Sequence, residues 1–274
     1  MRIPSELNRR YWDELTPVHE ASRFYDVAGF LAGRSSLHSI EREAVGDVAG
    51  KSLLHLQCHF GLDTLSWARL GAEVVGVDFS GASIERAREL AKQAGLADQA
   101  RFLERNVLNL VSDSAGAFDV VFTSYGTITW LSDLGLWARG IAASLKENGL
   151  SFMVDTHPTS YLFEADESGR LARRYDYFHG TDPLRIGPDK DYADATHTTL
   201  ASEAWIWSLG DVFASLEEAG LRVHEFSEYP RTVYQQFPDM RRTSDRYWEF
   251  DAETLSLPLL FSLKARRKAG AERI

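Results

Sequence analysis

The chain has 274 residues, of which 44% are hydrophobic and 12% aromatic, and it carries a formal net charge of −10 at pH 7. This length and composition are enough for one large domain with a full apolar core. The negative charge repels phosphate backbones, and the short basic runs at 241–242 and 266–268 do not outweigh it. Nucleic acid is therefore not an expected partner.

Several sequence features indicate the compartment of the protein and whether it binds a metal. Its apolar runs are shorter than the roughly 18 residues that a membrane helix needs, and residues 1–6 do not have the layout of a signal peptide. The single cysteine, Cys58, can form neither an internal disulfide nor a cysteine metal site. His179, Asp182 and Asp176 lie close together, but such a mixture is typical of solvated loops. We therefore expect a cytoplasmic protein with no metal and no membrane partner, and the sequence does not indicate its oligomeric state.

From residue 51 onward, short apolar runs alternate with helical patterns, which is typical of a parallel sheet covered by helices on both faces. The predicted strands span 52–56, 72–78, 100–105, 118–123, 150–154, 221–226 and 259–265. The predicted helices span 64–70, 82–94, 134–147 and 209–219. The sequence thus predicts a doubly wound α/β domain.

Two segments interrupt this alternation. Residues 1–45 carry aromatic residues and helix signals without a strand, and we expect them to form a helical lid. Residues 159–203 show only weak strand signals, such as 174–178, and we expect them to be an inserted cap, because long irregular stretches in compact folds are usually functional or mobile. The predicted cofactor-binding domain then consists of 46–158 and 204–268.

The turn after the first strand, residues 57–61, lies where a doubly wound sheet brings its backbone close to a ligand. Gly61 is the one glycine left of the usual glycine-rich turn, which disfavours a dinucleotide, because a pyrophosphate needs free backbone amides there. Asp78 ends the second strand, where a carboxylate can accept hydrogen bonds from both hydroxyls of an adenosine ribose. Capping of the next helix is the alternative role of Asp78.

The end of the third strand offers a place for the adenine ring. The amide of Asn106 could face the amino group of adenine, while Phe79 and Val107 could sandwich the ring. Asn106 could equally begin a turn. The order and spacing of the three strand ends indicate an adenosine site more strongly than any one of these residues.

The stretches 56–65 and 71–80 resemble the cofactor-binding region of the class I S-adenosylmethionine-dependent methyltransferases. They are most similar to a bacterial branch with a Gln-Cys-His-Phe-Gly turn, and the likeness extends to 118–121, 155–158, 208–211 and 257–263. This resemblance implies a Rossmann-like, mostly parallel sheet of seven strands whose last strand is antiparallel. It also implies S-adenosyl-L-methionine as the cofactor and S-adenosyl-L-homocysteine as the product.

The resemblance further implies roles for individual residues. Gln57, Cys58 and Gly61 would hold the methionine and sugar portions, and Asp78 the ribose. Asn106 and Val107 would hold adenine, and Ser124 with Tyr125 would lie near the sulfonium. Many members carry an acid at the position of Gln57 and an aspartate at that of Asn106, although both residues here still offer hydrogen bonds. The full set of expected cofactor-binding residues is Tyr11, Tyr25, Gln57, Cys58, His59, Gly61, Asp78, Phe79, Ser80, Asn106, Val107, Ser124 and Tyr125.

Methyl transfer from a sulfonium is an in-line displacement that mainly requires alignment of the acceptor and exclusion of water. A hydroxyl or ammonium acceptor also needs a base, and His157, after the fifth strand, is the leading candidate, with a turn-forming role as the alternative. Asp155 could orient His157 or simply end its strand. His59 could orient the methionine end, and His197 could reach the acceptor from the cap. His55 is expected to be a core residue.

Aromatic residues could wall the site, because their faces favour a sulfonium electrostatically. The candidates are Tyr11, Trp12, Tyr25, Tyr125 and Trp130. Packing of an N-terminal helix on the core is an equal alternative for the first three.

These patterns together predict an S-adenosylmethionine-dependent methyltransferase that acts on oxygen, nitrogen or carbon of a small molecule. One alternative is a nicotinamide-dependent oxidoreductase on a similar sheet, which would need a glycine-rich phosphate turn. Another is a non-catalytic protein that only binds the cofactor. The sequence does not identify the acceptor.

Overall fold

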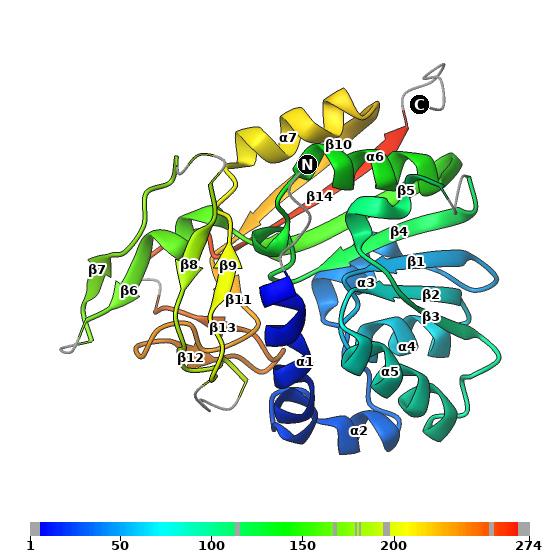
Figure 1. The fold of residues 1–274 in the computed structure, drawn as a ribbon, viewed down its shortest axis with the longest axis horizontal. Helices are drawn as coiled ribbons and strands as arrows, with labels where there is room; N and C mark the ends of the chain where they lie inside the picture. The colour runs from blue at the N-terminus through cyan, green and yellow to red at the C-terminus, as the bar shows by residue number, and fades with distance from the viewer. Residues whose placement is uncertain are drawn as a thin grey trace.

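The computed structural model describes residues 6–112, 116–166, 169–178, 180, 182–193, 198–251 and 255–267. Its centre is a seven-stranded sheet of order β10-β14-β5-β4-β1-β2-β3 (Figure 1). The strands are β1 (Ser52–Leu56), β2 (Glu73–Asp78), β3 (Ala100–Glu104), β4 (Phe118–Ser124), β5 (Leu145–Thr156), β10 (Leu221–Tyr229) and β14 (Leu260–Arg267). The β14 strand runs antiparallel to both of its neighbours, and the other pairs are parallel. The predicted seven-stranded sheet with an antiparallel last strand is therefore confirmed.

Helices cover both faces of this sheet, as expected for parallel strands. One face carries α3 (Ser39–Val45), α4 (Leu62–Arg69) and α5 (Gly81–Gln93). The other face carries α6 (Leu134–Ser144), α7 (Leu209–Glu218) and the short η1 (Val107–Ser112). Leu53 joins the first core and Leu54 the second, because successive side chains of a strand point to opposite faces.

The sheet order reverses between β1 and β4. The chain passes from β1 outward to β2 and β3 and then returns to pair β4 with the other edge of β1. In such sheets, ligands bind beyond the carboxyl ends of the strands at this switch point. The site is therefore expected where Leu56 and Ser124 end their strands.

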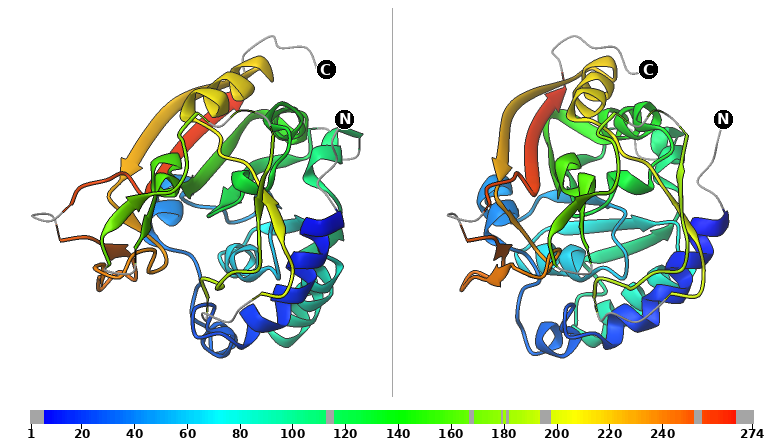
Figure 2. Two further views of the ribbon diagram at one scale, coloured as in Figure 1. Left: turned by 60° about the vertical axis from the view of Figure 1, so that its left-hand side comes forward. Right: turned by 90° about the vertical axis from the view of Figure 1, so that its left-hand side faces the viewer.

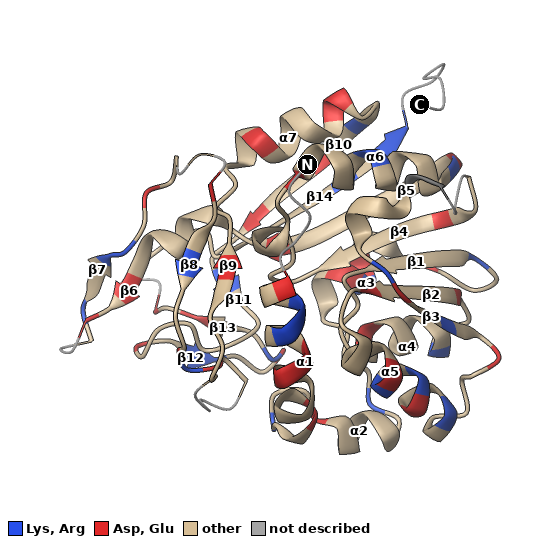
Figure 3. Cartoon of the chain, viewed as in Figure 1, with Lys and Arg blue, Asp and Glu red and all other residues tan. Residues whose placement is uncertain are grey.

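Three helices make up the described part of the N-terminal segment: α1 (Glu6–Ala21), α2 (Val27–Leu31) and α3. Figure 2 shows α1 lying between α5 and the strand β9 (Ser202–Ala204). Arg86 of α5 forms a 2.6 Å ion pair with Glu20 of α1, and Figure 3 shows acidic and basic residues mixed along both helices. Polar contacts thus attach α1 to the domain.

Three small antiparallel sheets lie beyond the carboxyl ends of the central strands (Figure 1). The first follows the short helix η3 (Pro158–Leu162) and pairs β6 (Phe163–Ala165) with β7 (Leu171–Arg173). The second pairs β8 (Leu184–Ile186) with β9. The third lies between β10 and β14 in the sequence and consists of β11 (Arg231–Thr232), β12 (Arg241–Arg242) and β13 (Trp248–Glu249). The weak strand signal at 174–178 does not correspond to a strand. The β7 strand ends before it, because its partner strand β6 begins at Phe163, which pairs with Arg173, so the pairing ends there.

The helix predicted to reach residue 147 ends instead at Ser144. Leu145 has extended backbone angles, φ −71° and ψ 136°, and it pairs with Phe118 at the start of β4. Asn148 and Gly149, which follow the predicted helix, therefore lie inside β5. Asn148 takes a φ of 65° there, in the part of β5 where its pairing with β4 shifts register.

Candidate cofactor and acceptor site

The turn between β1 and α4 has an alternating backbone. Gln57, His59 and Gly61 adopt left-handed φ angles of 54°, 51° and 82°. Such angles are uncommon for residues other than glycine and are retained where the surrounding structure requires them. At Gly61 an added Cβ would also lie 2.6 Å from Cε1 of Phe102. Glycine is thus needed at position 61, while His59 is held left-handed by its contacts.

Asp78 ties the end of β2 to this turn. One carboxylate oxygen accepts the backbone N–H of His59 at 2.8 Å, and the other accepts that of Ser80 at 2.9 Å. Asp78 is 7% exposed, and burial raises the pKa of its carboxyl to about 6 against these hydrogen bonds, which lower it. Each oxygen keeps a further lone pair, so the carboxylate can still accept ribose hydroxyls.

Gln57 provides an unusual acceptor at the same turn. Its Nε2 donates to the carbonyl of Thr127 at 2.8 Å, but its Oε1 is buried with no partner in the described parts of the chain. A buried acceptor without a donor is unfavourable, and a ligand ammonium group would satisfy it. The adjacent amino end of α4 favours a carboxylate electrostatically. The residues of this turn therefore fit the methionine portion of S-adenosylmethionine.

The predicted adenine-binding residues follow β3, beside Asp78. Asp78 pairs with Glu104, which places the ends of β2 and β3 together. Asn106 accepts the N–H of Leu108 at 3.0 Å and so begins η1, while Val107 is buried in the core. Phe79 remains partly exposed beside them. Their roles toward adenine stay predictions.

Ser124 and Tyr125 lie at the end of β4. Ser124 donates to Asp63 Oδ2 at 3.2 Å, and Tyr125, with φ 38°, donates its hydroxyl to Glu41 Oε2 at 2.7 Å. Burial raises the pKa of Glu41 to about 7, and the nearby charge of Asp63 adds to this effect. The ring of Tyr125 is therefore tied to α3.

Asp155 organises the turn after β4 rather than orienting His157. This fully buried carboxylate accepts the N–H of Gly126, of Thr127 at 3.0 Å and of Ile128 at 3.0 Å. That turn leads into the short helix η2 (Ile128–Trp130). Asp155 thus fixes the loop that carries the carbonyl to which Gln57 donates.

His157 is 3% exposed, and both of its ring nitrogens are engaged. Nδ1 lies 2.8 Å from the hydroxyl of Thr159, and Nε2 lies 2.9 Å from Glu228 on β10. Burial lowers the pKa of His157, and Glu228 raises it. These contacts lie on the β10 side of β5, whereas β4 and β1 lie on its other side. The role of His157 as a base stays a prediction of the sequence alone, and these contacts favour a structural role instead.

Aromatic residues of the N-terminal segment contact the turn directly. The ring of Trp12 meets that of His59 edge-on at 5.2 Å, and Tyr25 lies 4.8 Å from Phe60. Tyr11 stacks on Trp130 at 5.7 Å, and burial raises its pKa to about 12. The N-terminal segment thus places aromatic rings against the turn.

The remaining predicted residues have local structural contacts. Cys58 is 4% exposed, and burial raises the pKa of its thiol. Ser80 caps α5 by accepting the N–H of Ser83 at 3.1 Å, and it donates to Asp13 of α1 at 2.7 Å. His55 is the core residue that was predicted, 2% exposed and 2.7 Å from the hydroxyl of Thr64. His179 and His197 lie outside the described residues.

Two residues at the turn, His19 and Asp191, were missed by sequence reasoning. His19 Nδ1 lies 2.8 Å from His59 Nε2, and His19 Nε2 lies 3.0 Å from Asp191 Oδ2. His19 lies four residues after the apolar Leu15, so helical spacing would have placed it on the same face of α1. The contact with Asp191 spans 172 residues of sequence and leaves no local pattern.

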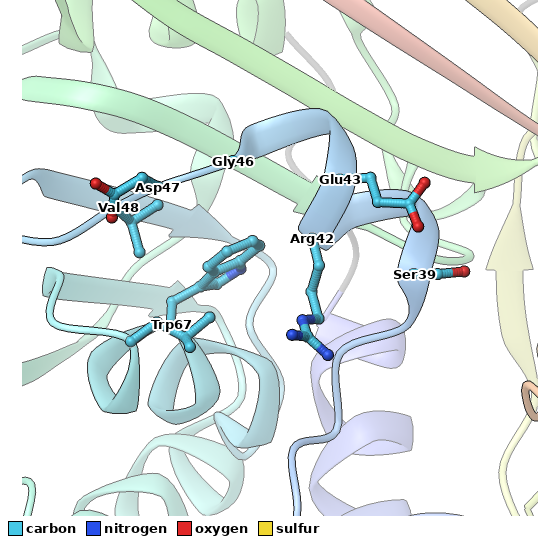
Figure 4. Close-up of a pocket in the computed structure, with 8 residues that line it drawn as sticks. Ser39, Arg42, Glu43, Gly46, Asp47, Val48 and Trp67 are labelled. Atoms are coloured by element: carbon cyan, nitrogen blue, oxygen red, sulfur yellow. The ribbon is translucent and has the colours of Figure 1, made fainter.

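A separate hollow of about 380 Å³ lies at the amino end of β1 (Figure 4). It is lined by Ser39, Arg42, Glu43, Gly46, Asp47, Val48, Trp67 and Leu70. Ligands of doubly wound sheets bind at the opposite edge, so we assign it no role in the site. Among the described residues, no group of three or more His, Cys, Asp or Glu side chains is arranged to hold a metal ion. No helix in the described ranges is long and apolar enough to span a membrane.

Comparison with known proteins identifies the kind of domain to which this site belongs. Residues 53–149 match the family model described as a methyltransferase domain. The ubiquinone biosynthesis O-methyltransferase of Acinetobacter baylyi is 28% identical over 162 residues, which cover 57% of this chain and 62% of that protein. The corresponding protein of Psychrobacter arcticus is 30% identical over 165 residues, covering 58% and 63%. The chain therefore spans less than two thirds of these relatives.

Solved structures show the same fold. An S-adenosylmethionine-dependent methyltransferase from Mesorhizobium loti superposes with a TM-score of 0.58 at 22% identity, covering 86% of this chain and 100% of that one. One described as putative in Listeria monocytogenes gives 0.62 at 15% identity, covering 89% and 99%. The chain therefore shares the fold of the S-adenosylmethionine-dependent methyltransferases, and its residues 53–149 match a methyltransferase domain.

Proposed function

We propose that this chain transfers the sulfonium methyl group of S-adenosylmethionine to oxygen, nitrogen or carbon of a small molecule, leaving S-adenosylhomocysteine. The observation that carries this proposal is the bond from the N–H of His59 to Asp78, because it joins a left-handed turn to a buried carboxylate at the switch point of the sheet. The match of 53–149 to a methyltransferase domain supports it. The names of the curated relatives favour oxygen as the acceptor atom.

In this proposal the cofactor, when bound, supplies an electrophilic methyl group, and the chain binds and orients it. Asp78 accepts the ribose hydroxyls, and Oε1 of Gln57 accepts the ammonium group. Trp12 and Tyr25 cover the turn, exclude water and present aromatic faces that favour positive charge.

We infer that the acceptor binds among four tyrosines: Tyr25, Tyr161, Tyr192 and Tyr234. Burial raises the pKa of each hydroxyl, for Tyr234 to about 12. Yet each keeps exposed surface, 43% for Tyr192. The ring of Tyr192 lies 6.5 Å from that of Tyr25 and 5.5 Å from that of Tyr234, so these side chains cluster, and in this proposal they border a recess open to solvent. Such a recess would hold a small molecule with an aromatic or apolar body and could bind its polar groups through the hydroxyls.

The helical lid (1–45), the inserted cap (159–203) and the cofactor-binding domain (46–158 and 204–268) remain our proposed division of the chain. Several contacts support a joint action of lid and cap. Asn8 of α1 exchanges two hydrogen bonds of 2.8 Å with the backbone of Glu203, and Thr199 donates to Glu14 at 2.8 Å. The two segments would therefore enclose the recess together.

The experiment that tests the activity is detection of S-adenosylhomocysteine after incubation with S-adenosylmethionine and panels of phenols, amines and carbon acids. We expect release with at least one class of acceptor, and loss of release in Asp78→Ala. Tight cofactor binding without transfer to any acceptor would favour a non-catalytic binding protein. Acceptor-dependent oxidation of a nicotinamide cofactor would favour the oxidoreductase alternative.

A further inference from the structure

Four segments that lie far apart in the sequence meet in one chain of hydrogen bonds beside residues 57–61, the turn after β1 that we call the cofactor turn. Asp191 Oδ2 lies 3.0 Å from His19 Nε2, and His19 Nδ1 lies 2.8 Å from His59 Nε2. His59 Nδ1 in turn lies 2.9 Å from the hydroxyl of Ser83 on α5. His19 has no exposed surface and Asp191 is 5% exposed, so bulk water does not compete for the bond between them.

The chemistry of the groups gives this chain a direction. A carboxylate only accepts, so Nε2 of His19 carries a hydrogen and its Nδ1, in the neutral ring, accepts. Nε2 of His59 must then donate, and its Nδ1 accepts the hydroxyl proton of Ser83. The hydroxyl of Ser83 has only one hydrogen to donate, so the hydroxyl of Thr16, 2.7 Å away, donates to Ser83 and shares its hydrogen with the carbonyl of Trp12 at 2.9 Å. The tautomers of both histidines are thus determined by the carboxylate of Asp191.

The residue next to Asp191 binds the same N-terminal segment. The hydroxyl of Tyr192 forms a hydrogen bond with that of Tyr25. The ring of Tyr25 stacks on His19 with centroids 5.1 Å apart and an interplanar angle of 28°. Asp191 therefore binds a ring nitrogen of His19, while Tyr192 binds the tyrosine that stacks on the flat face of the same ring.

We propose that Asp191 and His19 are positioning residues that fix the ring of His59, so that docking of segment 182–193 determines the shape of the cofactor turn. This inference rests on the proposed function, because it concerns the turn that would hold S-adenosylmethionine. His59 links the cofactor turn to this chain of hydrogen bonds, which we call the relay, because its backbone N–H binds Asp78 while its side chain binds His19. A fixed tautomer of this kind is a familiar task of a buried aspartate beside a histidine.

The sharpest test is Asp191→Asn, which keeps the volume of the side chain. Asp191 Oδ1 accepts the N–H of Ala193 at 2.8 Å, so the amide oxygen of the substituted side chain is required there and its NH₂ group faces His19. His19 Nε2 must then accept, and the hydrogens of both histidines move to Nδ1. We expect imidazole ¹⁵N spectra at about pH 8, where histidines are ordinarily neutral, to show this switch in His19 and His59. Asp191→Ala, which offers no acceptor, should give mixed tautomers.

The consequence for the cofactor is measured by calorimetry on the same proteins. We expect S-adenosylhomocysteine to bind about three- to tenfold more weakly to both variants, the effect of one hydrogen bond. Thr199→Val is the matched control, because it removes only a hydroxyl that binds Glu14 of α1, keeps the backbone bond from residue 199 to Glu14, and leaves the relay untouched. S-adenosylhomocysteine should bind to it as tightly as to the wild type.

The outcomes separate this inference from the proposed function. Unchanged tautomers in both Asp191 variants, or switched tautomers with unchanged affinity, would overturn it. Failure of the wild type to bind S-adenosylhomocysteine, with tautomers that still switch, would support the relay and contradict the proposed function alone.

Discussion

The carboxylate of Asp78 accepts the backbone N–H of His59 at 2.8 Å, so the last residue of β2 holds the turn that follows β1. A left-handed φ of 51° at a histidine is unfavourable by itself and is retained because this bond and the side-chain contact with His19 stabilise it. The cofactor turn thus owes its shape to hydrogen bonds of His59.

Gln57→Leu should separate ligand binding from folding. Because Oε1 has no partner in the described protein, the substitution loses only the bond to Thr127, and we expect the free energy of unfolding to change by no more than about 1 kcal/mol. S-adenosylmethionine should bind about tenfold more weakly. Calorimetry and thermal unfolding of the same samples check both values.

Gln236→Leu is the matched control for this prediction. Gln236 also donates to a backbone carbonyl, that of Ser160 at 3.0 Å, and also has a buried Oε1 without a partner in the described ranges. It does not lie in the cofactor turn, so cofactor affinity should be unchanged. Equal losses of affinity in the two variants would contradict the role given to Gln57.

Gly61→Ala should destabilise the protein more than Gly95→Ala. Both glycines are left-handed, with φ of 82° and 70°, but an added Cβ meets Phe102 at Gly61 and no described atom within 4 Å at Gly95. We expect a loss of about 1 kcal/mol at Gly95 and a further 1–3 kcal/mol or so at Gly61 from overpacking. Chemical denaturation measures the difference, and Phe102→Leu should restore part of it. Equal losses would show that the contact with Phe102 is readily relieved.

Sequence patterns predicted the strands near the site well, because β1 and β2 are buried, short and bounded by turn residues. They also placed Asp78 correctly at the end of β2, because that position follows from the strand pattern itself. The start of β5 was missed because Leu145 continues the apolar spacing of α6, and only its pairing with Phe118 makes it extended. The contacts of His19 with Asp191 and of His157 with Glu228 join distant segments, so no local pattern could indicate them.

Glu41 should make the protein less stable as the pH rises. Burial raises its pKa from an ordinary 4.5 to about 7, so the folded protein binds this proton more tightly than the unfolded chain does. Its contribution is fully present below about pH 4.5 and is lost as the pH rises through about 7. At 1.36 kcal/mol for each pKa unit, this amounts to about 3 kcal/mol.

Glu41→Gln tests that contribution, because glutamine keeps the shape and stays neutral. We expect thermal unfolding of the variant to occur at a higher temperature than that of the wild type at about pH 8, with the two proteins converging near pH 5 or so. A wild type and variant with parallel pH profiles would show that Glu41 is not the group responsible.

His157→Gln should affect stability more than turnover. Its bonds to Thr159 and Glu228 hold the end of β5 against β10, and we expect a loss of about 1–2 kcal/mol of unfolding free energy. The turnover number should stay within about tenfold of the wild type. A loss of about 10²-fold or more would instead assign His157 the role of general base.

The measurement that tests the central claim most directly is calorimetric titration of the wild type and Asp78→Ala with S-adenosylmethionine, S-adenosylhomocysteine, NAD and NADP. We expect both adenosyl sulfur compounds to bind the wild type with about micromolar dissociation constants, which correspond to a binding free energy of about −8 kcal/mol. Both should bind the variant more weakly. Tight binding of NAD or NADP, with no binding of the sulfur compounds, would contradict the proposed methyltransferase function.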